Sequence, residues 1–183
     1  MKQSSFAAIV GLVIAAALFR LAPHPPNFAP IAAMALFAGA HIADRRLAFL
    51  VPLAAMFASD QVLGLHSGIV LVYVCMAISV VIGMQLKGRI RVATVAGASV
   101  LSSVMFFAIT NFGVWLTSGM YPPDLSGLVA CYVAAIPFFQ NTLAGDVLFA
   151  GFLFGGFALY RKIPRSRSGM SALRSCARSP FHR

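Results

Sequence analysis

The chain has 183 residues, of which 60% are hydrophobic and 10% charged, and its mean hydropathy is +0.89. A soluble domain carries charge on about a quarter of its residues, so this composition excludes an ordinary soluble domain and predicts an all-α membrane protein. The net charge of +10 does not indicate a nucleic-acid partner, because the basic residues lie between and after the apolar segments.

The apolar segments predict a six-transmembrane-helix bundle over residues 1–160. The second segment is short for a span and would have to stand untilted or thin the bilayer. The last apolar stretch contains Pro137, so we expect an interfacial or re-entrant piece over 125–136 before the sixth span. The first segment also fits a signal peptide, with small residues at 15–17. The predicted spans are 5–22, 28–43, 47–64, 68–86, 92–118 and 138–160.

Lysine and arginine set the expected orientation. With the N-terminus inside, 13 of the 14 basic residues fall on the cytoplasmic side, and only Arg20 lies outside. This bias predicts an inner-membrane protein with both ends in the cytoplasm, N-in/C-in. Residues 161–183 are basic and lack apolar periodicity, so we expect a disordered cytoplasmic tail that is attracted to anionic lipid.

Polar residues gather toward the outer ends of the predicted spans. Ionisable groups inside a span are functional candidates by default, and Asp60 and Asp146 are two of them. The grouping predicts an outward-facing polar cavity. The alternative is structural: Arg20 pairs with Asp60 or Asp124, and Asp146 and Asn111 bond across helices as packing contacts.

Small residues at a spacing of four form several predicted helix faces. Cys75, Ser79 and Gly83 make one, and a similar stripe runs from Ser99 to Gly113 through Ser103, Phe106 and Thr110. A lone membrane cysteine is usually an inert small hydrophobe, although a thiolate facing a cavity could ligate a metal-bearing ligand. Two further faces allow close helix approach, within the bundle or to a partner, and we expect packing within the bundle for the second: Ala7, Gly11 and Ala15, and Gly151 with Gly155.

Motifs for familiar enzyme chemistry are absent from the sequence. It contains no G-x-x-x-x-G-K-[ST], no H-E-x-x-H and no G-x-S-x-G. We therefore expect no enzyme activity and no intrinsic cofactor.

Several motifs resemble a family of small bacterial membrane transport proteins. They are PHPPNFAPIAAMALFAGA at 23–40, ASD at 58–60, TNFGVW at 110–115, YP at 121–122, CY at 131–132, AAIPFF at 134–139 and NTLAGD at 141–146. These proteins look like the S-components of energy-coupling-factor (ECF) vitamin transporters. The resemblance implies six helices and a vitamin-like substrate bound near the outer face.

Within that family the likeness is nearest to solitary S-components for vitamin B12, which implies cobalamin as the transported ligand. A cysteine near the outer end would hold the cobalt; Cys75 is the candidate and Cys131 the second. The implied partners are the lipid bilayer and an ECF-type ATPase module. Solitary operation stays open, because the first helix only approximates the family's A-x-x-x-A docking pattern. The expected ligand-binding residues are Arg20, Asn27, Asp60, Tyr73, Cys75, Asn111, Trp115, Tyr132, Asn141 and Asp146.

Two other functions fit the same sequence. One is a membrane scaffold or assembly protein, in which the polar residues serve only helix packing. The other is a corrinoid-modifying membrane protein that acts through Cys75. A scaffold would be purified without a coloured ligand, whereas a corrinoid-modifying protein would lose its chemistry in Cys75→Ser.

Overall fold

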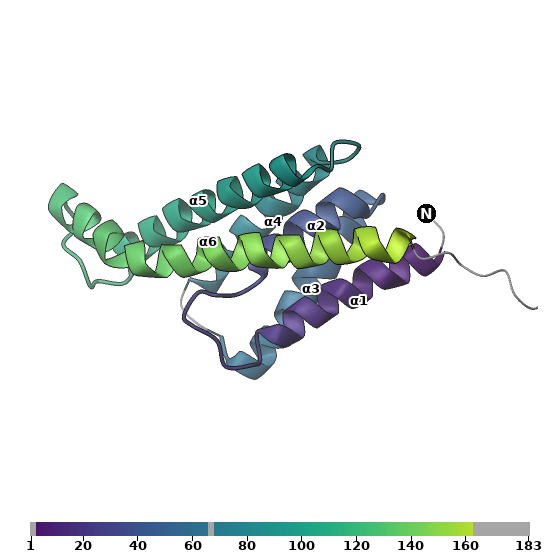
Figure 1. Cartoon of the computed structure of the whole chain (residues 1–183). Coiled ribbons are helices and arrows are strands. Elements are labelled where there is room, and N and C mark those ends of the chain that lie inside the picture. Colours follow the sequence, from purple (N-terminus) through teal and green to yellow (C-terminus); the bar gives the residue numbers. More distant parts are fainter. Residues whose placement is uncertain (1–2, 66–67, 163–183) are drawn as a thin grey trace, which may run out of the picture.

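The computed structural model describes residues 3–65 and 68–162, and this part of the chain is entirely helical apart from its connections (Figure 1). The predicted order of six helices is confirmed. The helices are α1 (Gln3–Phe19), α2 (Ile31–His41), α3 (Arg45–Leu63), α4 (Ile69–Gln85), α5 (Val92–Thr117) and α6 (Leu125–Lys162). The predicted tail lies mostly outside the described residues, since only Arg161 and Lys162 belong to them.

Three of these helices, α3, α5 and α6, are long and apolar enough to cross a membrane. The helices α1 and α4 have 17 residues each, and α2 has only 11. At 1.5 Å per residue α2 extends about 16 Å, roughly half the thickness of a hydrocarbon core. The predicted span 28–43 is therefore a shorter helix. Pro25, Pro26 and Pro30 explain its late start, because proline restricts its own backbone and that of the residue before it.

The short helix α2 is the centre of the bundle. It contacts each of the other five helices, and every residue from 32 to 40 is buried. Two glycines bring α2 and α4 into backbone contact. A Cβ atom on Gly39 would lie 2.2 Å from the Val80 carbonyl oxygen, and one on Gly83 would lie 2.3 Å from the Leu36 carbonyl oxygen. The small-residue face of α4 is thus a packing face against α2.

The prediction of a break before the sixth span is wrong, because α6 is one helix of 38 residues with Pro137 inside it. Proline removes one backbone hydrogen bond and crowds the preceding turn, which a long helix accommodates by bending. Figure 1 shows the first turns of α6 set at an angle to the rest. A non-helical break before the sixth span is thus absent, whereas an interfacial or re-entrant place for residues 125–136 stays a prediction.

The predicted packing of Gly151 and Gly155 within the bundle is also wrong. Both residues are exposed, and a Cβ atom on either would meet nothing within 4 Å. The small-residue face of α1, formed by Ala7, Gly11 and Ala15, is exposed as well. Neither face packs against another helix within residues 3–65 and 68–162.

The two ends of the bundle differ in composition. We call one the proline end: it holds residues 20–30 between α1 and α2, the start of α4, and residues 118–124 between α5 and α6. We call the other the arginine end: it holds residues 42–46 and 86–91 and the last turn of α6. Among the described residues, Arg20 is the one lysine or arginine at the proline end. The arginine end carries Arg45, Arg46, Lys87, Arg89, Arg91, Arg161 and Lys162.

Candidate functional site

A cavity of about 330 Å³ lies at the proline end, between residues 20–30, the start of α4, the last turns of α5 and the first half of α6. This volume is at the lower end of the range typical of small-molecule sites. The lining residues come from segments far apart in the sequence, so the cavity exists only in the folded chain. They are Asn27, Gly68, Leu71, Val72, Phe106, Phe107, Thr110, Asn111, Gly113, Val114, Thr117, Ser118, Met120, Ala135, Phe138, Phe139 and Thr142.

The cavity wall combines aromatic rings with uncharged polar groups. Two pairs of adjacent phenylalanines line it, 106–107 on α5 and 138–139 on α6. The ring centroids of Phe107 and Phe139 lie 4.8 Å apart. None of the described residues that line the cavity carries a charge. Aromatic walls favour flat ligands, and a few placed polar groups fix their orientation.

The polar wall residues present mainly hydrogen-bond acceptors. The hydroxyls of Thr110, Thr117 and Thr142 donate to carbonyl oxygens one turn earlier, at 2.7, 2.8 and 3.1 Å. The Asn111 amide nitrogen likewise donates to the Phe107 carbonyl at 2.8 Å. Each hydroxyl oxygen and the Asn111 amide oxygen retains acceptor capacity. A ligand with N–H or O–H groups therefore suits this wall.

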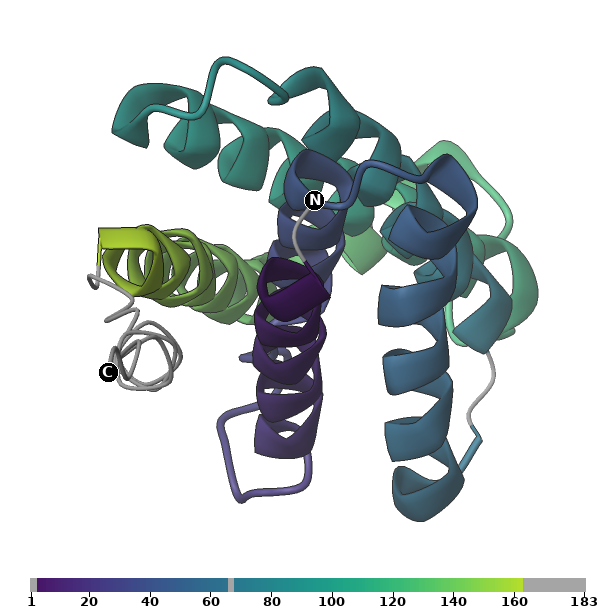
Figure 2. The same cartoon turned by 90° about the vertical axis from the view of Figure 1, so that its right-hand side faces the viewer.

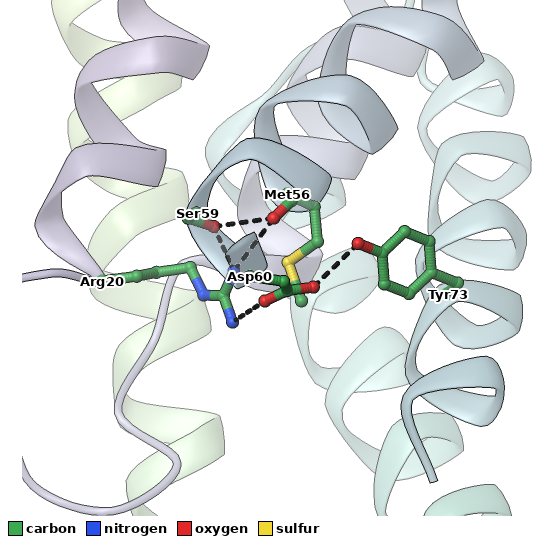
Figure 3. A network of polar contacts seen from close by, with 5 residues as sticks. All are labelled: Arg20, Met56, Ser59, Asp60 and Tyr73. Atoms are coloured by element: carbon green, nitrogen blue, oxygen red, sulfur yellow. Dashed lines mark hydrogen bonds and ion pairs between the residues drawn. The ribbon is translucent and has the colours of Figure 1, made fainter. Parts of the chain in front are cut away.

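Arg20, Asp60 and Tyr73 form a separate polar network, and none of the three lines the cavity (Figure 3). Arg20 Nη2 lies 2.8 Å from Asp60 Oδ1, and the Tyr73 hydroxyl donates to Asp60 Oδ2 at 2.7 Å. Arg20 Nη1 also donates to Ser59 Oγ and, at 3.5 Å, to the Met56 carbonyl. These contacts tie the end of α1 to α3 and α4. Of the two pairings expected for Arg20, the one with Asp60 is present.

Asp146 is also a structural link between helices. Its carboxylate accepts a bond from Ser103 Oγ at 2.8 Å and one from the Ala33 amide at 3.4 Å. Its exposed fraction is 2%. It joins α6 to α5 and α2 one turn below Thr142, which lines the cavity, and thus matches the packing alternative.

Cys75 is buried on the face of α4 that packs against α2, with an exposed fraction of 1%. Val72, one turn earlier, lines the cavity, but Cys75 is not among the lining residues. The Cys131 thiol contacts the Asn111 carbonyl at 3.4 Å. Within residues 3–65 and 68–162, no three His, Cys, Asp or Glu side chains are grouped to hold a metal ion.

Three more predicted residues donate side-chain hydrogen bonds to backbone carbonyls of other segments. Trp115 Nε1 donates to the Pro122 carbonyl at 2.9 Å, and the Tyr132 hydroxyl donates to the Ala108 carbonyl at 2.5 Å. Asn141 Nδ2 donates to the Pro26 carbonyl at 3.0 Å and so holds the 20–30 connection on α6. Of the ten predicted ligand-binding residues, Asn27 and Asn111 line the cavity.

Sequence reasoning missed most of the aromatic wall. Phe107, Phe138 and Phe139 were not candidates, although Phe106, Thr110 and Gly113 belonged to the small-residue stripe expected on this helix. The signal available was the repeated Phe-Phe pair on two helices. In a chain with 16 phenylalanines, such a pair is hard to distinguish from ordinary packing.

Asp124 directly precedes the first residue of α6 at the proline end. Its Oδ1 accepts bonds from the Gly127 amide and the Ser126 hydroxyl, both at 2.7 Å. The Gly127 amide bond, with the Ser126 hydroxyl second, lowers the pKa of Asp124 below its usual value of 3.8. The carboxylate therefore stabilises the folded chain above that value.

We expect this stabilisation to be lost as the pH falls from 3.8 through the lower pKa of the folded state. Asp124→Ala should melt at a lower temperature than the wild type near neutral pH, and the gap should close in acid. Thermal unfolding in detergent across this pH range measures it. Asp124→Asn, which keeps an acceptor without the charge, is the control. A gap for Asp124→Ala that is independent of pH would contradict the assigned role of the charge.

No curated protein and no solved structure matches the chain. One family model does match, over residues 1–167 of the 183, and it describes a family of unknown function. Because the match covers nearly the whole chain, the protein belongs to the family of unknown function DUF6580.

Proposed function

We propose that the protein is a multi-pass inner-membrane protein that binds a vitamin-like small molecule in the cavity at its proline end and mediates its uptake. In this proposal the arginine end faces the cytoplasm, since basic residues accumulate on that side of membrane proteins. The proline end and its cavity then face outward. The six helices form a bundle like that of ECF S-components, with α2 as its buried core.

The cavity wall is the observation that carries this proposal. A scaffold needs polar side chains only as contacts between helices, and Asp146 with Ser103 is such a contact. The cavity instead places aromatic rings and uncharged acceptors around an open volume of about 330 Å³. Such a site is suited to a flat, uncharged molecule with a few N–H or O–H groups.

The size of the cavity and the place of Cys75 favour a ligand smaller than cobalamin. A corrinoid is much larger than the flat rings that this volume accommodates, and the buried Cys75 thiol does not line it. Cobalamin would require the connections at the proline end to move apart and α4 to turn. We therefore place a smaller ring-containing vitamin ahead of cobalamin as the substrate class.

The exposed small-residue face of α1 supports a membrane partner. Gly11 has nothing within 4 Å of an added Cβ atom, and Ala7 and Ala15 lie on the same exposed face. Small residues let a second helix approach closely. An ATPase module docked there would provide energy for uptake, whereas a solitary protein would carry its ligand only down a gradient.

The test is the set of small molecules that the purified protein retains, identified by mass spectrometry. We expect the wild type to retain a flat, uncharged compound and Asn111→Leu to bind it about tenfold more weakly, because loss of one buried polar partner costs about 1.4 kcal/mol. The matched control is Gln61→Leu, which also replaces a side-chain amide by leucine but at an exposed residue of α3. Retained cobalamin would colour the protein red and restore the corrinoid as the ligand. If wild type and Asn111→Leu retain the same compounds equally, the cavity is not the binding site.

A further inference from the structure

A second cavity lies at the other end of the molecule, between α5 and α6. The two helices are close near residues 118–124 and diverge toward the arginine end (Figures 1 and 2). The groove between them has a volume of about 410 Å³. It runs along the first turns of α5 and the last turns of α6, and its lining includes the small residues Ala96, Ser99, Ala150, Gly151, Gly155 and Ala158.

The buried hydroxyl of Ser99, which lines this groove, requires a hydrogen-bond acceptor. The exposed fraction of Ser99 is 0%, and its hydroxyl has no hydrogen-bond partner among the described residues. A buried hydroxyl without a partner destabilises a fold unless a bound molecule supplies an acceptor. Since Ser99 lines the groove, a ligand seated there is placed to supply one.

The dimensions of the groove fit one hydrocarbon chain better than a helix. From Val147 to Ala158 its lining extends about 16 Å at 1.5 Å per residue. The whole empty volume between the two helices, about 850 Å³, then corresponds to a channel of at most about 53 Å² in cross-section. A helix about 10 Å in diameter needs about 80 Å², whereas carbon chains pack at contact distances of about 4 Å. A lipid acyl chain is therefore the better occupant.

The basic residues at one end of the groove indicate an anionic lipid. Arg91 lines the groove at its open end, and Lys87 and Arg89 precede it in the same connection. Basic pockets between helices on the cytoplasmic side bind anionic lipid headgroups. Ser99 lies about 12 Å along α5 from Arg91, a distance that a glycerol headgroup and the long arginine side chain can bridge together.

We infer that the groove between α5 and α6 binds one anionic phospholipid, whose glycerol lies along Gly155 and Gly151 and whose acyl chain begins at the level of Ser99. Its phosphate binds Arg91, and an ester carbonyl accepts the bond from Ser99. This site requires membrane embedding only, and it is independent of the ligand in the cavity at the proline end.

The test is native mass spectrometry of the full chain in detergent, titrated with phosphatidylglycerol or with phosphatidylcholine carrying the same acyl chains. We expect one phosphatidylglycerol to bind more tightly than phosphatidylcholine. Gly155→Leu should abolish this binding by filling the groove. Gly156→Leu is the matched control, because Gly156 is equally exposed and open but does not line the groove.

The contribution of charge is tested separately at two exposed arginines. Arg91→Gln should weaken phosphatidylglycerol about fivefold, the effect of one basic residue near a lipid surface. It should weaken phosphatidylcholine less, because the choline ammonium already neutralises the charge of the phosphate. Arg89→Gln, outside the lining, is the control and should have the smaller effect. Equal binding by Gly155→Leu and Gly156→Leu, or equal affinity of the wild type for both lipids, would overturn the site. These outcomes do not depend on what the cavity at the proline end retains.

Discussion

Replacing Arg20 by methionine is expected to destabilise the protein by about 3–5 kcal/mol. The carboxylate of Asp60 has an exposed fraction of 2% and pairs with Arg20 at 2.8 Å. Without the guanidinium, Asp60 would keep a buried charge with the Tyr73 hydroxyl as its remaining side-chain donor. Equilibrium unfolding in mixed detergent and SDS, followed by the fluorescence of the single tryptophan, measures the loss.

Removing both charges should cost much less than removing one. A buried ion pair is costly to desolvate, so replacing the pair by apolar residues is often close to neutral. We expect the double variant Arg20→Met with Asp60→Leu to recover most of the stability lost in Arg20→Met. The control is Arg45→Met, at an exposed arginine of α3. An Arg20→Met variant as stable as Arg45→Met would show that the network contributes nothing.

The helices were predictable because apolar segments separated by basic or proline-rich connections leave few alternatives. The ends of the helices were less predictable. The start of α2 depends on how Pro25, Pro26 and Pro30 turn the chain, and the continuity of α6 through Pro137 depends on whether neighbouring helices tolerate a bend. Both outcomes are decided by packing between helices, which a single sequence does not specify.

The cavity shows a different limit of prediction from the sequence. Of the ten predicted ligand-binding residues only Asn27 and Asn111 line it, because a buried aspartate has the same sequence pattern whether it binds a ligand or another helix. Asp60 and Asp146 both bind other helices. The wall that surrounds the cavity consists of phenylalanines and threonines, which are inexpensive in a membrane and therefore do not stand out in the sequence.

The second large effect is expected at the contact between α2 and α4. A methyl group on Gly39 would lie 2.2 Å from the Val80 carbonyl oxygen, far inside van der Waals contact, and the obstacle is backbone. Because α2 contacts all five other helices, it cannot move away from α4 without disturbing the remaining contacts. We expect Gly39→Ala to destabilise the protein by about 3 kcal/mol, the upper part of the range for overpacked cores, in the same unfolding assay.

Gly83→Ala should behave like Gly39→Ala, since its methyl group would lie 2.3 Å from the Leu36 carbonyl oxygen. Gly11→Ala is the matched control: Gly11 is also inside a helix, but nothing lies within 4 Å of its Cβ position. There the lower flexibility of alanine should stabilise the helix by about 0.5–1 kcal/mol. The same methyl group should thus have opposite effects at the two kinds of site. If all three variants are equally stable, α2 and α4 are not in backbone contact, and α2 is not the packed core from which the cavity walls are built.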